Sequence, residues 1–226
     1  MSFRTGKDPV QLTATDSTIY TVPASRRPTL IELGFINLDT VNRTPTVHFV
    51  PSGQLVATSR RVIGGTESVI KPGETQIYRF RQFLAPSDFI SWKADAATAI
   101  SAWCAVVEET EDVALFRNVN ADFLTASLVS QRVIATGRQA SLIEVILHNT
   151  DTVDRVATVH FIPSGGAAGN ANIFVGGTVT GAGLIKPGET ITYAWNQHRG
   201  AGVDIQAKAD TASVVVAKLS VLEEEV

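Results

Sequence analysis

The feature that most constrains this chain is an internal duplication. Residues 29–54 read TLIELGFINLDTVNRTPTVHFVPSGQ and residues 141–166 read SLIEVILHNTDTVDRVATVHFIPSGG, so the two stretches align without a gap at an offset of 141 − 29 = 112. Further along, IKPGET recurs at residues 70–75 and 185–190, where the offset is 185 − 70 = 115. A repeat of this kind predicts two copies of one structural unit, each with its own core.

The matching stretches also place the domain boundaries. Residues 12–14 match residues 124–126 at the first offset, and the second offset holds through the last strands of both copies. We therefore expect a first domain over residues 1–109 and a second over residues 122–226. The three added residues (115 − 112 = 3) fall in the glycine-rich stretch 165–183. We expect that stretch to be a surface loop or hairpin tip, because surface connections accept changes of length at little cost.

The residues between the copies, 110–121, have the composition of an ordered connector. A free linker is richer in glycine, serine or proline, whereas this stretch carries the apolar residues Val113, Leu115 and Phe116. We expect these three side chains to pack between the two domains or against a neighbouring subunit.

Within each copy, apolar residues alternate with polar ones, and turn residues interrupt them roughly every eight to twelve residues. This pattern is typical of an all-β chain, so we expect two tandem homologous antiparallel β-sandwich domains, of the jelly-roll or Ig-like kind. Pro72 and Gly73 suit the two central positions of a type II turn, and Asp39 is placed to pair with Arg43 in another turn. No stretch has sustained helical periodicity, so helices should be short or absent.

Composition excludes several classes of function. Lys and Arg total 19 against 22 Asp and Glu, and the net charge of −3 gives no electrostatic reason to expect nucleic acid as a partner. No run of 18 apolar residues is present, and the first residues lack the apolar core of a secretory signal. We therefore expect a soluble chain made in a cytoplasm, with no membrane partner. Cys104 is the only cysteine, which excludes an internal disulfide and a zinc site built on paired cysteines.

The residues that could carry chemistry form no catalytic pattern. His48 and His160 occupy the same position in the two copies, and each is expected to be a structural, hydrogen-bonding histidine because no close-set second metal ligand accompanies it. Cys104 aligns with Leu219 and is expected to be a buried small hydrophobe. We therefore expect no catalytic residues, no cofactor and no metal, and a protein that is not an enzyme.

Comparison of the copies separates the two faces of the strand that begins near residue 100. Its even-numbered residues are apolar in both copies and are expected to face the core; they are Ile100, Ala102, Cys104 and Val106, which align with Val215, Ala217, Leu219 and Val221. Trp103 aligns with Lys218. Because lysine is rarely a core residue, we expect Trp103 on the outward face, shielded by a partner or by the connector. Trp103 therefore joins Val113, Leu115 and Phe116 as a candidate interface residue.

Four short motifs resemble small β-sandwich proteins of tailed bacteriophage particles. They are TVP at residues 21–23, TVHFVPSG at 46–53, IKPGET at 70–75 and ISWKA at 90–94, and the second copy has counterparts of the last three at 158–165, 185–190 and 205–209. The resemblance covers nearly the whole chain, although the tandem arrangement departs from the single-domain form. It implies a virion structural protein, such as a head decoration protein or a tail accessory protein.

The resemblance further implies how such a protein works. It is made in the host cytoplasm and resides in the virion, where it decorates or cements the head, or forms an accessory part of the tail, through contacts with other virion structural proteins. A homo-oligomer is expected, and three copies of a duplicated domain could form a ring with pseudo-sixfold symmetry. The alternative is a module that binds a host-surface carbohydrate or other receptor through loop tips such as residues 165–183. Aromatic residues are only 7% of the chain, which leaves few rings to stack on a host glycan.

Overall fold

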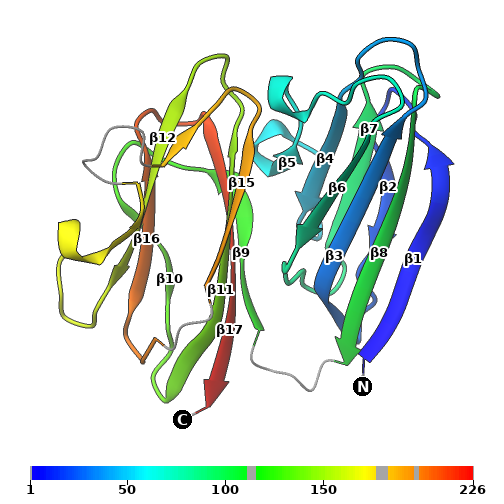
Figure 1. Ribbon diagram of the computed structural model, residues 1–226. Helices are drawn as coiled ribbons and strands as arrows, with labels where there is room; N and C mark the ends of the chain where they lie inside the picture. Colours follow the sequence, from blue (N-terminus) through cyan, green and yellow to red (C-terminus); the bar gives the residue numbers. More distant parts are fainter. Residues whose placement is uncertain (1, 111–115, 177–182, 196–198, 226) are drawn as a thin grey trace. The chain divides into compact units, whose positions relative to one another are not determined.

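The chain divides into two compact units, Met1–Ala114 and Leu115–Val226, which are described separately (Figure 1). The structure is a computed structural model and describes residues 2–110, 116–176, 183–195 and 199–225. Within these ranges the helices are three 3₁₀ helices, η1 (Thr58–Arg60), η2 (Thr66–Ser68) and η3 (Asn170–Asn172). None of the described helices has the length and apolar character needed to span a membrane.

Both units consist of antiparallel strands, as the alternating pattern predicts. Unit 1 contains β1 (Ser2–Gln11), β2 (Ser17–Thr21), β3 (Arg26–Asn37), β4 (Pro45–Val50), β5 (Arg61–Ile63), β6 (Thr75–Phe80), β7 (Phe89–Ala94) and β8 (Ile100–Thr110). Unit 2 contains β9 (Phe116–Phe123), β10 (Val129–Val133), β11 (Arg138–Asn149), β12 (Arg155–Ile162), β13 (Ile173–Val175), β14 (Leu184–Ile185), β15 (Thr190–Trp195), β16 (Asp204–Ala209) and β17 (Val215–Glu225).

The strand order identifies each unit as a jelly roll. In unit 1 one sheet has the order β1-β8-β3-β6 and the other β2-β7-β4-β5, so the hydrogen-bonded pairs β1 with β8, β2 with β7, β3 with β6 and β4 with β5 are nested. Such nesting is what a long antiparallel hairpin produces when it is rolled into two facing sheets. Unit 2 repeats it with β9-β17-β11-β15 and β10-β16-β12-β13. The expected pair of tandem β-sandwiches is confirmed, and the jelly-roll topology is selected over the Ig-like one.

Aromatic side chains join the two sheets of unit 1. Phe35 on β3 meets Trp92 on β7 edge to face, with ring centroids 6.2 Å apart, and Phe49 on β4 meets Phe80 on β6 at 5.4 Å. All four rings are 2% exposed or less. Edge-to-face pairs of this kind stabilise a core by about 1 kcal/mol beyond the burial of their area. Trp92 and Phe80 therefore both point into the core.

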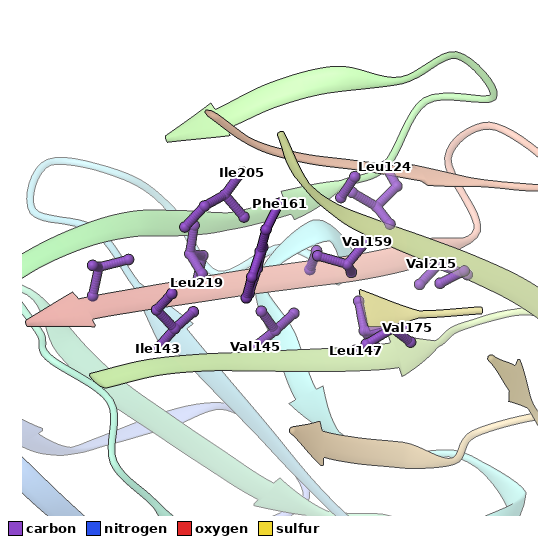
Figure 2. Packing of buried hydrophobic residues seen from close by; sticks show 14 of the residues in the cluster. Leu124, Ile143, Val145, Leu147, Val159, Phe161, Val175, Ile205, Val215 and Leu219 are labelled. Carbon is purple, nitrogen blue, oxygen red and sulfur yellow. The ribbon is translucent and has the colours of Figure 1, made fainter. Parts of the chain in front are cut away.

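The core of unit 2 is built at the same positions, with Leu147 and Ala207 in place of Phe35 and Trp92. Figure 2 shows Ile143, Val145 and Leu147 of β11 and Val159 and Phe161 of β12 pointing into the same space between the sheets. On the last strand of each unit the even-numbered core positions of β8, and the positions aligned with them in β17, are 7% exposed or less. The predicted core face of this strand is therefore confirmed in both copies. The other face differs between them, because Val216, Lys218 and Ser220 of β17 are also 2% exposed or less.

The turn after β3 is held by a buried asparagine. The Nδ2 group of Asn37 donates to the carbonyl oxygens of Val41 and Ile70, both at 2.8 Å, and its Oδ1 accepts from the backbone N–H of Asp39 at 2.9 Å. Asp39 in turn accepts from Nε of Arg43 at 2.8 Å, which confirms the expected pairing. Hydrogen bonding to Arg43 holds the pKa of Asp39 below its ordinary value.

Unit 2 reproduces this turn almost atom for atom. Asn149 donates to Val153 and Ile185 at 2.8 and 2.9 Å and accepts from Asp151 at 2.9 Å. Arg155 donates to Asp151 at 2.8 Å. Because the two turns agree in every one of these bonds, the repeated residues of this segment stabilise the same turn conformation in both units.

The IKPGET stretch forms the expected type II turn in both units. Gly73 and Gly188 have φ angles of 74° and 73°, a region that side-chain-bearing residues rarely adopt. The turn closes through a bond from the backbone N–H of Glu74 to the carbonyl of Lys71 at 3.0 Å. Proline and glycine thus serve the roles that the sequence predicts.

Two expectations about segment boundaries require correction. The stretch 165–183 is not simply a loop, because Ile173–Val175 forms strand β13, which pairs with β12 as β5 pairs with β4. The strand escapes sequence analysis because it has only three residues between glycine-rich segments.

The expected connector, 110–121, overlaps the first strand of unit 2. Residues 116–121 belong to β9, which pairs with β17 as β1 pairs with β8. In each pair the register shifts at the same place in the first strand, at residues 8–9 of β1 and at residues 120–121 of β9 (120 − 8 = 112). The duplication therefore extends upstream of residues 10 and 122. The side chains of these strands differ between the copies, so only backbone pairing reveals their equivalence.

Candidate functional site

Trp103 lies on the outer face of unit 1, over a glycine. It stands directly opposite Gly34 in the β3–β8 pair, one residue away from the core-facing Cys104. A Cβ atom added to Gly34 would lie 1.9, 2.0 and 2.4 Å from three consecutive ring atoms, Cζ2, Cε2 and Cη2. Because three neighbouring ring atoms are almost equally close to this added atom, the plane of the indole covers Gly34. The expected outward position of Trp103 is therefore observed, and its indole is half-buried.

Both members of this pair are different residues in the second copy. At the offset of 112 Gly34 corresponds to Ile146, and at the offset of 115 Trp103 corresponds to Lys218. A branched side chain at position 34 would occupy the space of the indole, so the tryptophan requires the glycine. Lys218 is itself only 2% exposed, so the reason for expecting an outward Trp103 was incomplete: a lysine in one copy did not mark a solvent-exposed position.

Exposed groups surround the indole on the same face. Ile77 of β6 stands opposite Gly34 on the other side and is 45% exposed. Two residues further along, Arg79 donates from Nε to Glu32 at 2.6 Å, and its side chain is 67% exposed. Tryptophan and arginine are among the residue types that most often carry binding energy in protein interfaces.

Of the other candidate interface residues, Phe116 alone lies in the described part of the chain. Val113 and Leu115 fall outside the described residues. Phe116 is the first residue of β9, and its backbone pairs with Leu222. Phe116 belongs to unit 2 and Trp103 to unit 1, so the shared interface role of these residues stays a prediction.

His48 and His160 occupy equivalent places in the two units, as expected, and both are buried at 4% and 5% exposure. His160 has a hydrogen-bond partner in Asn172, whereas His48 lies beside the carboxylate of Asp16, with Nδ1 and Oδ1 3.4 Å apart. No group of three or more His, Cys, Asp or Glu side chains that could hold a metal occurs among the described residues. The thiol of Cys104 is buried, and burial raises its pKa to about 12, which is unfavourable for a nucleophile.

Sequence analysis missed a buried carboxylate at one end of each sandwich. Glu108 is 2% exposed and accepts from the hydroxyl of Tyr20 at 2.7 Å and from Arg26 at 3.0 Å. Glu223 in unit 2 is 0% exposed and accepts from Nε of Arg132 at 2.7 Å. The run of glutamates at residues 223–225 is typical of a solvated terminus, but β17 carries Glu223 into the sandwich.

A signal for these carboxylates was present in the alignment of the copies. Glu108 and Glu223 match at the offset of 115, and Tyr20 matches Arg132 at the offset of 112. Burial, followed by the hydrogen bond to Glu108, raises the pKa of the Tyr20 hydroxyl. Each buried carboxylate therefore has at least one polar partner, although Oε2 of Glu223 has no hydrogen-bond partner among the described residues.

The sequence matches no family model and no curated protein. Among solved structures, the major capsid protein P2 from Bacteriophage PM2 is 12% identical, with 100% of this chain and 97% of that chain covered and a TM-score of 0.40. A structure from Sulfolobus Turreted Icosahedral Virus is 10% identical, with 98% and 90% covered and a TM-score of 0.37. PNGase F, a glycosylasparaginase from Flavobacterium meningosepticum, is 8% identical, with 98% and 96% covered and a TM-score of 0.48. These likenesses concern the arrangement of strands, since few side chains are shared.

Proposed function

We propose that this chain is a structural protein of a virus particle and acts through contacts with other virion proteins. The motifs that resemble phage β-sandwich proteins are the turns and strands that build the two jelly rolls. Each unit closes on its own core, and the duplicated polar residues described above serve turns and buried pairs. The outer faces of the sheets are then the surfaces left for binding. In its finer form, the proposal places the protein on the head, as a decorating or cementing subunit, or on the tail, as an accessory subunit.

One observation supports a particular binding surface, the outer face of unit 1 around Trp103. On the outer face of unit 1, the Trp103 indole covers Gly34 beside the exposed Ile77, whereas unit 2 has replaced both members of the pair. A duplicated scaffold tolerates such a paired change without loss of its core, and tryptophan is enriched among the residues that carry binding energy in protein interfaces. We assign this surface, called the Trp103 face, to contact with a second virion subunit, either another copy of this chain or its neighbour in the particle.

The exchange between the copies supplies a test variant. The double substitution Gly34→Ile with Trp103→Lys installs the residues of unit 2 and removes the aromatic ring while filling the space above β3. We expect the double variant to fold with unchanged far-ultraviolet circular dichroism and to lose at least about tenfold in affinity for particles that lack the native protein, as for an interface hot spot. Binding is measured by co-sedimentation of the purified protein with such particles.

Three outcomes of that experiment are distinct. Full binding by the folded double variant would contradict the assignment of the Trp103 face. Failure of the wild-type chain to bind particles of any kind would contradict the structural role itself. Binding of the wild-type chain to a glycan array, lost in the double variant, would replace the virion partner with a carbohydrate.

The location on the particle is a separate measurement. Electron microscopy of native particles that carry the labelled protein distinguishes the head from the tail by the site of the label. We expect regularly spaced label at one of these sites. We also expect a homo-oligomer, whose mass is measured by light scattering in solution.

A further inference from the structure

The two copies keep a histidine in the same place and surround it differently. In unit 2, Nδ1 of His160 lies 3.0 Å from Oδ1 of Asn172. That oxygen also accepts from the backbone N–H of Gly169 at 3.0 Å, and Nδ2 of Asn172 donates to the carbonyl of Ala167 at 2.9 Å. The loop therefore holds a neutral partner against the imidazole. In unit 1 the position of Asn172 is taken by Arg60 (172 − 60 = 112).

A cation stands beside the histidine of unit 1. Arg61 lies directly opposite His48 in the β4–β5 pair, as Ile173 lies opposite His160 in the β12–β13 pair. The strand pairing is thus the same in the two units, and the residue next to the histidine changes from aliphatic to charged. Burial lowers the pKa of Arg61 from its ordinary value, although the guanidinium stays protonated.

Among the described residues one carboxylate, that of Asp16, faces His48, and it already has a partner. Asp16 replaces Leu128 of unit 2 (128 − 16 = 112). Its Oδ2 accepts from Nζ of Lys93 at 2.8 Å, while its Oδ1 lies 3.4 Å from Nδ1 of His48, which is long for a hydrogen bond. Within the described part of the chain, Nδ1 of His48 has no hydrogen-bond partner. The imidazole therefore sits near two cations, Arg61 and Lys93, and one shared anion.

These surroundings oppose a charge on His48. Burial, helped by the charges of Lys93 and Arg61, lowers its pKa from 6.5 to about 4, although Asp16 acts in the opposite direction. Above pH 6.5 the imidazole is neutral whether the site is closed or open, and no cost arises. As pH falls from 6.5 towards 4, an opened site takes up a proton that the closed site refuses, so acid favours opening.

Strand β5 is the element best suited to open. It has three residues and, among the described strands, pairs with β4 alone, with a register shift between Val47 and His48. Helix η1 precedes it, and Arg60 in η1 donates to Gln54 of the same loop at 3.2 Å. The buried Val62, at 0% exposure, holds the strand at neutral pH. Release of β5 would admit water to the imidazole at the expense of little backbone pairing.

We propose that His48 is an acid-sensitive latch: its protonation, opposite Arg61 and near Lys93, releases η1 and β5 from β4 in unit 1. His160, which faces Ile173 and Asn172, leaves β13 in place at the same pH. With a pKa of about 4 in the closed site and 6.5 in the open one, the equilibrium constant for opening increases roughly 30-fold between pH 8 and pH 5. The latch is independent of where the protein resides, since it depends only on the residues of unit 1.

Amide hydrogen exchange of the full chain, followed by mass spectrometry and corrected for the intrinsic rate at each pH, tests the latch. We expect the protection of residues 58–63 to fall roughly 30-fold between pH 8 and pH 5. The equivalent residues 170–175 provide the internal control, and their protection should change less than about threefold. Equal loss of protection in both segments, or no loss in residues 58–63, would overturn the proposal.

Two variants separate titration of His48 from a general loosening in acid. His48→Gln removes the titrating group and should abolish the pH response of residues 58–63, whereas His160→Gln should preserve it. Arg61→Ile installs the residue of unit 2 and keeps His48, and it should reduce the response because one repelling charge is gone. A full response in folded His48→Gln protein would refute the latch. So would an unreduced response in Arg61→Ile protein, even if His48→Gln fails to fold.

Discussion

Replacing Asn37 with alanine removes three hydrogen bonds from a site that water does not reach. The side chain is 0% exposed, and the bonds to Val41, Ile70 and Asp39 are 2.8, 2.8 and 2.9 Å long. Each bond contributes about 1 kcal/mol net; the bond to Ile70 is buried, and those to Val41 and Asp39 are partly buried. We therefore expect Asn37→Ala to lower the free energy of unfolding of unit 1 by about 3 kcal/mol.

Guanidinium unfolding measures this loss, because each unit has its own fluorescent reporters. Trp92 and Trp103 belong to unit 1 and Trp195 to unit 2. With a denaturant dependence of roughly 3 kcal/mol/M, a loss of about 3 kcal/mol lowers the midpoint by about 1 M. Asn37→Ala should shift the transition of unit 1, and Asn149→Ala should shift that of unit 2 by the same amount, since the two networks have nearly equal bond lengths.

The exposed valines of the same turns are matched controls. Val41 and Val153 are each 51% exposed and contribute only their carbonyl groups to the networks, so alanine at either position should cost less than about 0.5 kcal/mol. A midpoint shift below about 0.3 M for both asparagine variants would refute the reasoning. A difference of more than about 1.5 kcal/mol between the two would show that the repeated turns are not energetically equivalent.

Two further predictions concern buried groups. Glu223→Gln keeps the shape of the side chain but removes the charge that faces Arg132. We expect it to lower the free energy of unfolding of unit 2 by about 2 kcal/mol. A thermal unfolding midpoint unchanged within about 1 °C would argue against a structural ion pair. Burial raises the pKa of the Cys104 thiol to about 12. We therefore expect the thiol to resist alkylation by iodoacetamide at pH 8 in the folded protein and to react fully in guanidinium. Rapid labelling of the folded chain would place the thiol at the surface.

Agreement between sequence and structure is best where the two copies share residues. The side chains of Asn37, Asp39 and Arg43 predict a turn because asparagine and aspartate bond to nearby backbone groups, and the structure shows those bonds. Alternation across the last strand predicts its core face for a similar reason, since a strand turns successive side chains to opposite sides. In both cases the interactions are local, and a single segment contains the information.

Agreement is poorest where a residue depends on strands far away in the sequence. Glu223 reads as part of an acidic terminus, but its partner Arg132 lies 91 residues earlier and meets it only when the sheets close. Likewise, the outward direction of Trp103 follows from alternation, whereas the glycine beneath it is identified only by the pairing of β3 with β8. Neither contact can be predicted from the residues close to it in the sequence.

The candidate site was accordingly predicted in part. Trp103 was singled out by its mismatch with Lys218, but its neighbours Ile77 and Arg79 were not, because they reach the same face through the β3–β6 pairing. The surroundings of His48 were also missed, since Asp16 and Lys93 are distant in sequence and come together on the second sheet.

By itself the sequence determined that this protein contains two copies of one antiparallel sandwich, where the copies match, and which turns join their strands. These properties follow from side-chain periodicity and from backbone preferences that act over a few residues. Only the tertiary structure decided that the sandwiches are jelly rolls, that the first strands begin upstream of the visible repeat, and that equivalent histidines have unlike neighbours. Those outcomes depend on which strands pair across long separations, and the free energy of that pairing comes from the closed core as a whole.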